Sequence, residues 1–151
     1  MLHAIQKFFR GKIGVDSKSG PDEHGLHLAT AALLFEMLRA DNDEHPIERR
    51  TLEKALQTQF DLGKAETHEL AALADREAAE STSLYQFTGL INEHFAPEQK
   101  LQVVEMLWQV AFADGHLDPY EEALVRKIAD LIYVPHRDFI QSKHRVMQAL
   151  K

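Results

Sequence analysis

The chain of 151 residues contains no cysteine. This absence excludes disulfide bonds, thiolate metal sites and a cysteine nucleophile, and it fits a reducing compartment. The chain also lacks any run of about 18 apolar residues, the length that a membrane-spanning helix needs. Its first residues, MLHAIQKFFRGK, contain no long apolar stretch followed by a small-residue cleavage site. We therefore expect a cytoplasmic protein without an export signal.

Positive charge is scarce and unevenly placed. The chain has 17 Lys and Arg residues against 24 Asp and Glu residues, which gives a net charge of −7. Residues 1–15 hold three of the basic residues and no acidic residue, so the remainder carries a net charge of −10. An acidic body repels nucleic-acid phosphates, so we expect no binding of DNA or RNA. The same charge favours cations or basic protein partners.

The usual catalytic signatures are missing as well. No Gly-x-Ser-x-Gly elbow and no glycine-rich phosphate loop occurs, and the serines have no motif around them. We therefore expect a protein that is not an enzyme. One enzymatic alternative stays open, a metal-dependent hydrolase that would use clustered carboxylates.

Every periodic segment has the period of an α-helix, and no stretch alternates long enough for a strand. Residues 26–40, for example, place Leu28, Ala31, Ala32, Phe35 and Leu38 on one face. Residues 98–113 are apolar on nearly every side, which predicts a central helix. We predict an all-α fold of about seven helices, with residues 16–151 forming a single domain. The aromatic residues Trp108, Phe112 and Tyr133 are expected in its core.

Residues 1–15 form a separate basic segment. A short amphipathic helix is predicted at roughly residues 2–10, followed by a link that contains three glycines, two serines and a proline. Its apolar side chains include Leu2, Ile5, Phe8 and Phe9. Two interpretations stay open for them. The helix docks on the domain or on a partner, or residues 2–12 make peripheral contact with an anionic membrane surface such as the inner membrane.

The sequence also contains an internal repeat. Residues 34–53, LFEMLRADNDEHPIERRTLE, align without a gap on residues 107–126, LWQVAFADGHLDPYEEALVR. In this alignment the matching positions include Asp41 with Asp114, Pro46 with Pro119, and Glu48 with Glu121. We interpret the chain as two related, pseudo-symmetric helix–loop–helix halves. If they pack about a pseudo-twofold axis with their loops adjacent, the acidic residues of both loops converge.

The loop of each half places an acidic residue at the end of one helix and another at the start of the next. Glu121 is well placed to cap its helix after Asp118 and Pro119, which needs no ligand. Asp41 and Asp114 are harder to explain, because a carboxylate at a helix C-terminus faces the negative end of the helix dipole. Their charge calls for a hard cation such as Ca²⁺ or Mg²⁺, or for neighbouring arginines. The spacing after Asp114 does not match an EF-hand, since Pro119 falls where glycine is required.

This duplicated pattern, ADGHLDPYEEALVRKIADLIYV with its echo ADNDEHPIERRTLEKAL, resembles the tellurite-resistance TerB-like family from about residue 24 to residue 145. The resemblance implies an all-helical fold of two similar halves with an acidic metal-binding site at the loop ends. The matching positions are Asp41, Glu48, Asp114 and Glu121. The first half departs from the family pattern, because Asn42 stands where glycine is usual and Arg49-Arg50 follow Glu48.

The expected function combines the charge pattern with this resemblance. We expect a module that binds a divalent cation and an unidentified protein partner, with a scaffold or regulatory role in stress response or tellurite resistance. A structural adaptor without metal is the alternative. The histidines offer a second possible metal site, because His24 and His27 are spaced at i and i+3, and His116 lies inside the second acidic loop.

Overall fold

The computed structural model describes residues 7–13, 22–40, 46–60, 62–80, 86–112 and 119–149. Over these ranges a short π-helical turn, η1, is followed by seven α-helices, α2 to α8, and no strand occurs. Their bounds are η1 Phe9–Ile13, α2 Glu23–Ala40, α3 Pro46–Phe60, α4 Lys64–Glu80, α5 Gln86–His94, α6 Pro97–Ala111, α7 Pro119–Leu131 and α8 His136–Ala149. The all-α prediction is therefore confirmed.

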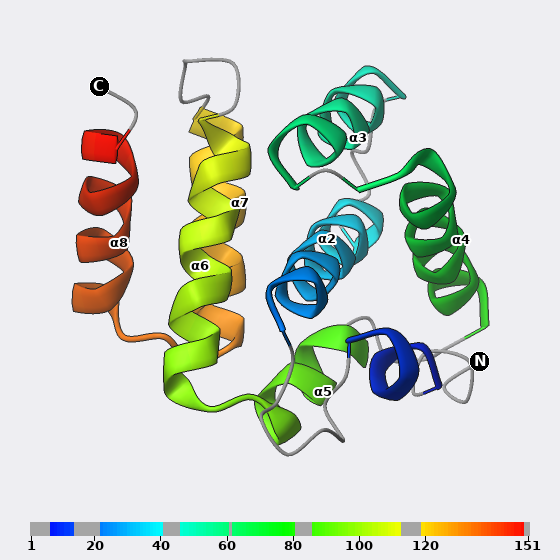
Figure 1. Ribbon diagram of the computed structural model, residues 1–151, viewed down its shortest axis with the longest axis horizontal. Coiled ribbons are helices and arrows are strands. Elements are labelled where there is room, and N and C mark those ends of the chain that lie inside the picture. The colour runs from blue at the N-terminus through cyan, green and yellow to red at the C-terminus, as the bar shows by residue number, and fades with distance from the viewer. Residues whose placement is uncertain are drawn as a thin grey trace.

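Helix α2 runs through the middle of the molecule. In Figure 1, α3 lies above it, α4 to its right, and α5 with η1 below it. Helices α6, α7 and α8 stand on the other side, with α6 packed against α2 and α8 at the outer edge. Helix α2 contacts η1, α3, α4, α5, α6 and α7.

This central position buries more of residues 26–40 than the predicted apolar face alone. Every residue from Leu28 to Met37 is buried, including Thr30 and Glu36. A helix with neighbours on all sides is enclosed, whatever the polarity of individual residues. The predicted central helix, now α6, buries Val103, Val104, Leu107, Trp108 and Ala111, but it exposes Gln102 and Gln109.

Several helices begin where their sequences predict. Helix α2 is capped by Asp22, whose Oδ1 accepts a hydrogen bond of 2.7 Å from the Gly25 amide. Proline is the first residue of α3, α6 and α7, the helical position at which its missing amide hydrogen is harmless. Before α6, the Gln99 side chain accepts a hydrogen bond of 2.7 Å from the Ala96 amide.

The order of helices follows the predicted alignment. Pro46 and Pro119, which match in that alignment, begin α3 and α7. Helix α2 packs against α3 and α4, and α6 packs against α7 and α8. The two halves therefore contain the same succession of contacting helices. Their relation by duplication and by a pseudo-twofold axis stays a prediction.

Helix α7 ends in a turn with a left-handed residue, a position that glycine usually occupies. The Tyr133 amide donates to the Asp130 carbonyl at 3.1 Å, and the Val134 amide donates to the Ala129 carbonyl at 2.9 Å, which is the Schellman pattern. Tyr133 has a φ of 61°. Its side chain is 77% exposed, so the prediction that Tyr133 belongs to the core is wrong. The turn directs this ring to the surface, whereas Trp108 and Phe112 are buried as expected.

We expect Tyr133→Gly to stabilise the protein by about 0.5–1 kcal/mol, because glycine adopts a positive φ without strain. The ring contributes little in return, since it is largely exposed and the Lys100 ammonium lies as far as 5.8 Å from its centroid. Urea denaturation of both proteins measures this difference. Tyr133→Ala is the control, because it removes the ring and keeps the strained Cβ. A loss of stability in Tyr133→Gly would contradict the assignment of strain.

The N-terminal segment packs on the domain. Phe8, Phe9 and Ile13 are buried, while Lys7, Arg10 and Lys12 are exposed. The Phe9 ring lies 5.9 Å from Phe95, and the Phe8 ring meets Phe87 edge to face at 6.4 Å. The docking interpretation therefore holds for these three apolar residues. Leu2 and Ile5 lie outside the described residues, and both the peripheral membrane contact and the boundary after residue 15 stay predictions.

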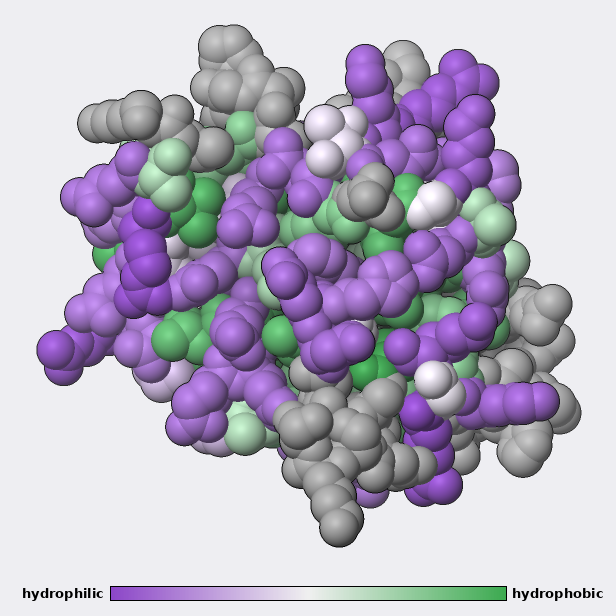
Figure 2. All heavy atoms as spheres, viewed as in Figure 1, coloured by the Kyte–Doolittle hydropathy of each residue, from purple (hydrophilic) through white to green (hydrophobic). Residues whose placement is uncertain are grey.

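The surface is mainly hydrophilic. Figure 2 shows purple side chains over most of the visible face, with small green areas between them. In the part of the chain that the structure covers, Tyr133 and Met147 are the large apolar residues that are exposed. None of the helices there is both long and apolar enough to cross a membrane.

Candidate functional site

Two of the four predicted metal ligands lie in the first turns of helices, and the other two lie outside the described residues. Asp41 directly follows α2, but it lies outside the described residues, as does Asp114 between α6 and α7. Glu48 is in the first turn of α3, and its side chain also lies outside the described part. Glu121 is in the first turn of α7, where its side chain is half-buried. A carboxylate in the first turn is stabilised by the positive end of the helix dipole.

The helices on either side of the two predicted acidic loops contact one another across the two halves. Helix α2 contacts α6 along the centre of the molecule, α3 also contacts α6, and α2 also contacts α7. The two helix–loop–helix units therefore share one interface. Among the residues with described side chains, no group of three or more histidine, aspartate or glutamate residues is arranged to hold a metal ion. Asp41, Glu48 and Asp114 are not among those residues, so the predicted ligand set stays a prediction.

A lysine from α8 reaches the start of α7. The Lys143 ammonium donates a hydrogen bond to Glu122 Oε2, next to Glu121. It also lies 5.6 Å from the centroid of the Trp108 ring. The Lys143 side chain is 25% exposed, so water screens this ion pair less than a fully exposed pair. Sequence analysis missed Lys143, because nothing in the spacing of α8 indicates which helix its residues face.

Trp108 lies beneath the Lys143 ammonium and packs between α6 and α8. It is fully buried, and its ring lies 5.0 Å from Phe139 of α8 and 6.0 Å from Phe112. Its indole Nε1 is buried and has no hydrogen-bond partner among the residues that the structure describes. A second ion pair, between Arg145 and Glu105, links α8 to α6.

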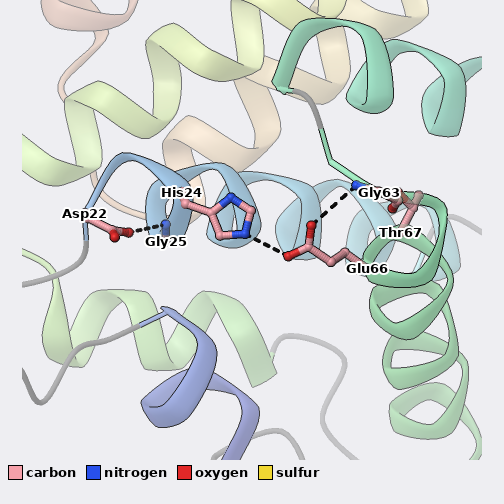
Figure 3. Close-up of polar contacts among 6 residues, drawn as sticks. All are labelled: Asp22, His24, Gly25, Gly63, Glu66 and Thr67. Atoms are coloured by element: carbon pink, nitrogen blue, oxygen red, sulfur yellow. Dashed lines mark hydrogen bonds and ion pairs between the residues drawn. The ribbon is translucent and has the colours of Figure 1, made fainter.

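A second polar cluster lies at the starts of α2 and α4, and Figure 3 shows it. His24 Nε2 lies 2.7 Å from Glu66 Oε2. The Gly63 amide donates a hydrogen bond of 3.3 Å to Glu66 Oε1, which ties the carboxylate to the start of its own helix. Partial burial raises the pKa of Glu66, but the hydrogen bonds from His24 and Gly63 outweigh it, so the pKa falls below its ordinary value. The cluster joins α2 to α4.

The two histidines that offered a second metal site make separate contacts. His27 stacks on the Phe60 ring, with centroids 4.2 Å apart and planes within 6°. Glu23 Oε1 lies 3.9 Å from His27 Nε2. His24 instead pairs with Glu66 across the α2–α4 interface. The structure thus gives both side chains roles in packing, and His116 lies outside the described residues.

The pKa of His27 predicts that stability depends on pH. Burial lowers the pKa of His27 below its ordinary 6.5; Glu23 opposes this effect and His24 adds to it. The unfolded chain therefore binds a proton more readily, so the stability contributed by His27 is complete above pH 6.5 and is lost as the pH falls below that value. Its slope is at most about 1.4 kcal/mol per pH unit.

We expect His27→Phe to flatten the stability profile between pH 7.5 and pH 5.5, because phenylalanine keeps the stacking on Phe60 and does not titrate. Urea midpoints at several pH values measure this profile. His68→Gln serves as the control, since it also removes a histidine, from the exposed face of α4. An equally steep profile in His27→Phe would show that another group titrates.

A buried carboxylate anchors α5. Glu36, which is only 2% exposed, accepts hydrogen bonds from the Phe87 amide at 2.8 Å and the Thr88 amide at 3.2 Å. The Thr88 hydroxyl donates a third at 2.8 Å. The α2 carboxylate therefore satisfies backbone groups at the start of α5 that a helix leaves unpaired. The signal in the sequence was a single glutamate inside the apolar run AALLFEML, and sequence analysis overlooked it.

Comparison with known proteins agrees with this architecture. The family model described as tellurite resistance protein TerB matches residues 27–144, from the first turns of α2 to the last turns of α8. No curated protein matches the chain. No solved structure matches it. The match covers the helices of both halves, and with the all-helical fold it shows that the chain belongs to the TerB family of tellurite-resistance proteins.

Proposed function

We propose that this TerB-family module binds a divalent cation through Asp41, Glu48, Asp114 and Glu121, and that the loaded form binds a protein partner in tellurite resistance or stress response. The observation that supports it most is the matched placement of Glu48 and Glu121. Each stands at the second position after a proline that begins a helix, and the helices before them, α2 and α6, pack together.

The chemistry of the four side chains fits such an ion. All are carboxylates, and hard oxygen donors suit Ca²⁺ and Mg²⁺. Two carboxylates about 6 Å apart repel by roughly 3 kcal/mol at an effective dielectric constant of about 20. A bound cation would offset that repulsion, and at a concentration of 100 Kd it would add about 2.7 kcal/mol of stability.

Thermal denaturation of metal-stripped protein tests the proposal. Saturating Ca²⁺ or Mg²⁺ should raise Tm by roughly 5–10 °C, because each kcal/mol moves the Tm of a domain of this size by about 2–4 °C. Asp114→Ala should remove the rise. Glu69→Ala, which removes an exposed carboxylate from α4, should keep it. An unchanged Tm with every divalent ion would refute cation binding.

One observation favours a structural adaptor without metal. Glu122, next to Glu121, already has a counter-charge within the protein, the Lys143 ammonium. If arginines and lysines also neutralise the remaining carboxylates, the module needs no ion. The same titration separates the two functions, because an adaptor's Tm would not respond to divalent cations.

A further inference from the structure

The N-terminal segment differs from the helical domain on which it packs. We call residues 7–13 the strap. The family match begins at residue 27 and covers the helices from α2 to α8, so the strap lies outside it. Residues 14–21, which we call the link, join the strap to Asp22, and five of these eight residues are glycine, serine or proline. The strap therefore has the sequence context of a separate segment that contacts the domain through its side chains.

Aromatic rings in and directly after α5 receive the strap. Phe8 meets Phe87 edge to face at 6.4 Å, and Phe9 lies 5.7 Å from the His94 ring and 5.9 Å from the Phe95 ring. Helix α2 also contacts η1, and Figure 1 shows η1 next to α5 and below α2. We call these three rings, together with the adjoining part of α2, the strap-binding surface.

The strap meets this surface in the way that a short amphipathic peptide meets its receptor. Its three apolar side chains are buried and its three basic side chains are exposed. Apolar anchors of this kind provide affinity, and the face turned to solvent carries the charge. Such contacts depend on the side chains of the strap and of the surface, and they do not depend on the covalent link between them.

The charges of the strap also act on the domain. The pKa of Glu66 on α4 is raised by partial burial and lowered by its hydrogen bonds and by the charges of His24 and Lys12. Lys12 thus attracts a carboxylate of the domain. Since residues 1–15 carry a net charge of +3 and the remainder −10, this attraction adds to the apolar contacts and speeds association.

We propose that the strap-binding surface is a docking surface for a short basic segment with adjacent aromatic residues, and that the strap bound there can be replaced by the strap of a second copy of this chain. The second strap presents the same side chains, so the exchange preserves every contact. Within one chain, the link holds the strap at an effective concentration of about 1 mM, which favours the strap of the same copy. For a free strap with a Kd of about 10 µM, roughly one copy in a hundred would then have an open surface. The proposal is independent of the cation site.

A cleavable link tests the proposal in the full chain. A protease site inserted between Ser17 and Lys18 lies within the link, and the chain is cut only after it has folded with its strap in place. A fluorescent peptide of residues 1–15 stands in for the strap of a second copy, and its anisotropy is followed as protein is added. We expect saturable binding to the cut chain, and about 100-fold weaker binding to the uncut chain because the tethered strap competes.

Two peptide variants check which side chains are recognised. A Phe9→Ala peptide lacks the ring that packs near His94 and Phe95, so it should bind at least about 100-fold more weakly. An Arg10→Ala peptide lacks an exposed charge, and at about 0.15 M salt it should bind within about fivefold of the unchanged peptide.

Four results would overturn the proposal. Loss of the helical circular dichroism signal when the cut chain is diluted would make the strap an inseparable part of the core. Absence of peptide uptake by the cut chain would show that the strap does not exchange. Equal uptake by cut and uncut chains would place the peptide elsewhere on the protein. Equal affinity of the Phe9→Ala and unchanged peptides would reduce the binding to attraction between charges.

Discussion

Glu36→Ala should destabilise the protein by about 3–5 kcal/mol, because it removes the three hydrogen bonds that its carboxylate accepts from Phe87 and Thr88 and leaves these two amides without that partner. Each buried group that loses its partner costs about 1–3 kcal/mol, and the missing side chain also leaves a void beside α5. A domain typically has about 5–15 kcal/mol of stability in total, so this one residue should account for a large part of it.

Urea denaturation followed by circular dichroism measures this loss. Glu69→Ala on the exposed face of α4 is the matched control, and it should change stability by no more than about 0.5 kcal/mol. Thr88→Val removes the hydrogen bond from the Thr88 hydroxyl to Glu36, so its loss of stability should lie between those of Glu36→Ala and Glu69→Ala. A loss below about 1 kcal/mol in Glu36→Ala would mean that water replaces the carboxylate at the start of α5.

The helices could be predicted because their signals are local. Apolar residues repeat with the helical period, and the prolines at positions 46, 97 and 119 each begin a helix. The packing around each helix is not local. Residues 26–40 have one strongly apolar face, but only the arrangement of six neighbouring elements around α2 buries its other faces, including the Glu36 carboxylate.

The candidate site likewise has features that are local in the sequence and features that depend on packing. The duplicated spacing of Asp41, Glu48, Asp114 and Glu121 is visible in the sequence, because it depends only on residue types and intervals. Their convergence stays a prediction. Lys143 belongs to the next helix along the chain and reaches the start of α7 only because α8 returns alongside it. The exposure of Tyr133 could not be predicted either. Its residue type favours a place in the core, but the turn after α7, in which Tyr133 has a positive φ, directs its ring to the surface.

Phe9→Ala should destabilise the whole protein by about 3–4 kcal/mol, because truncating a buried phenylalanine loses its transfer free energy and leaves a cavity. Phe9 is fully buried, and its ring contacts His94 and Phe95 at the end of α5 with centroids 5.7 Å and 5.9 Å away. Because η1 also packs on α2, the loss should appear in global unfolding and not only in the N-terminal segment.

Arg10→Ala provides the control one residue further along, since Arg10 is exposed and its loss should cost less than about 0.5 kcal/mol. Global stability is best read from the helical circular dichroism signal, and local opening of the segment from amide hydrogen exchange in α5 and η1. Unchanged global stability with fast exchange confined to η1 would make residues 1–15 an independent appendage. If global stability falls and amide exchange becomes faster in both α5 and η1, then Phe8, Phe9 and Ile13 belong to the same cooperative core as α2. A membrane contact by residues 2–12 would then need either this core to open or the exposed Lys7, Arg10 and Lys12 to act by charge alone.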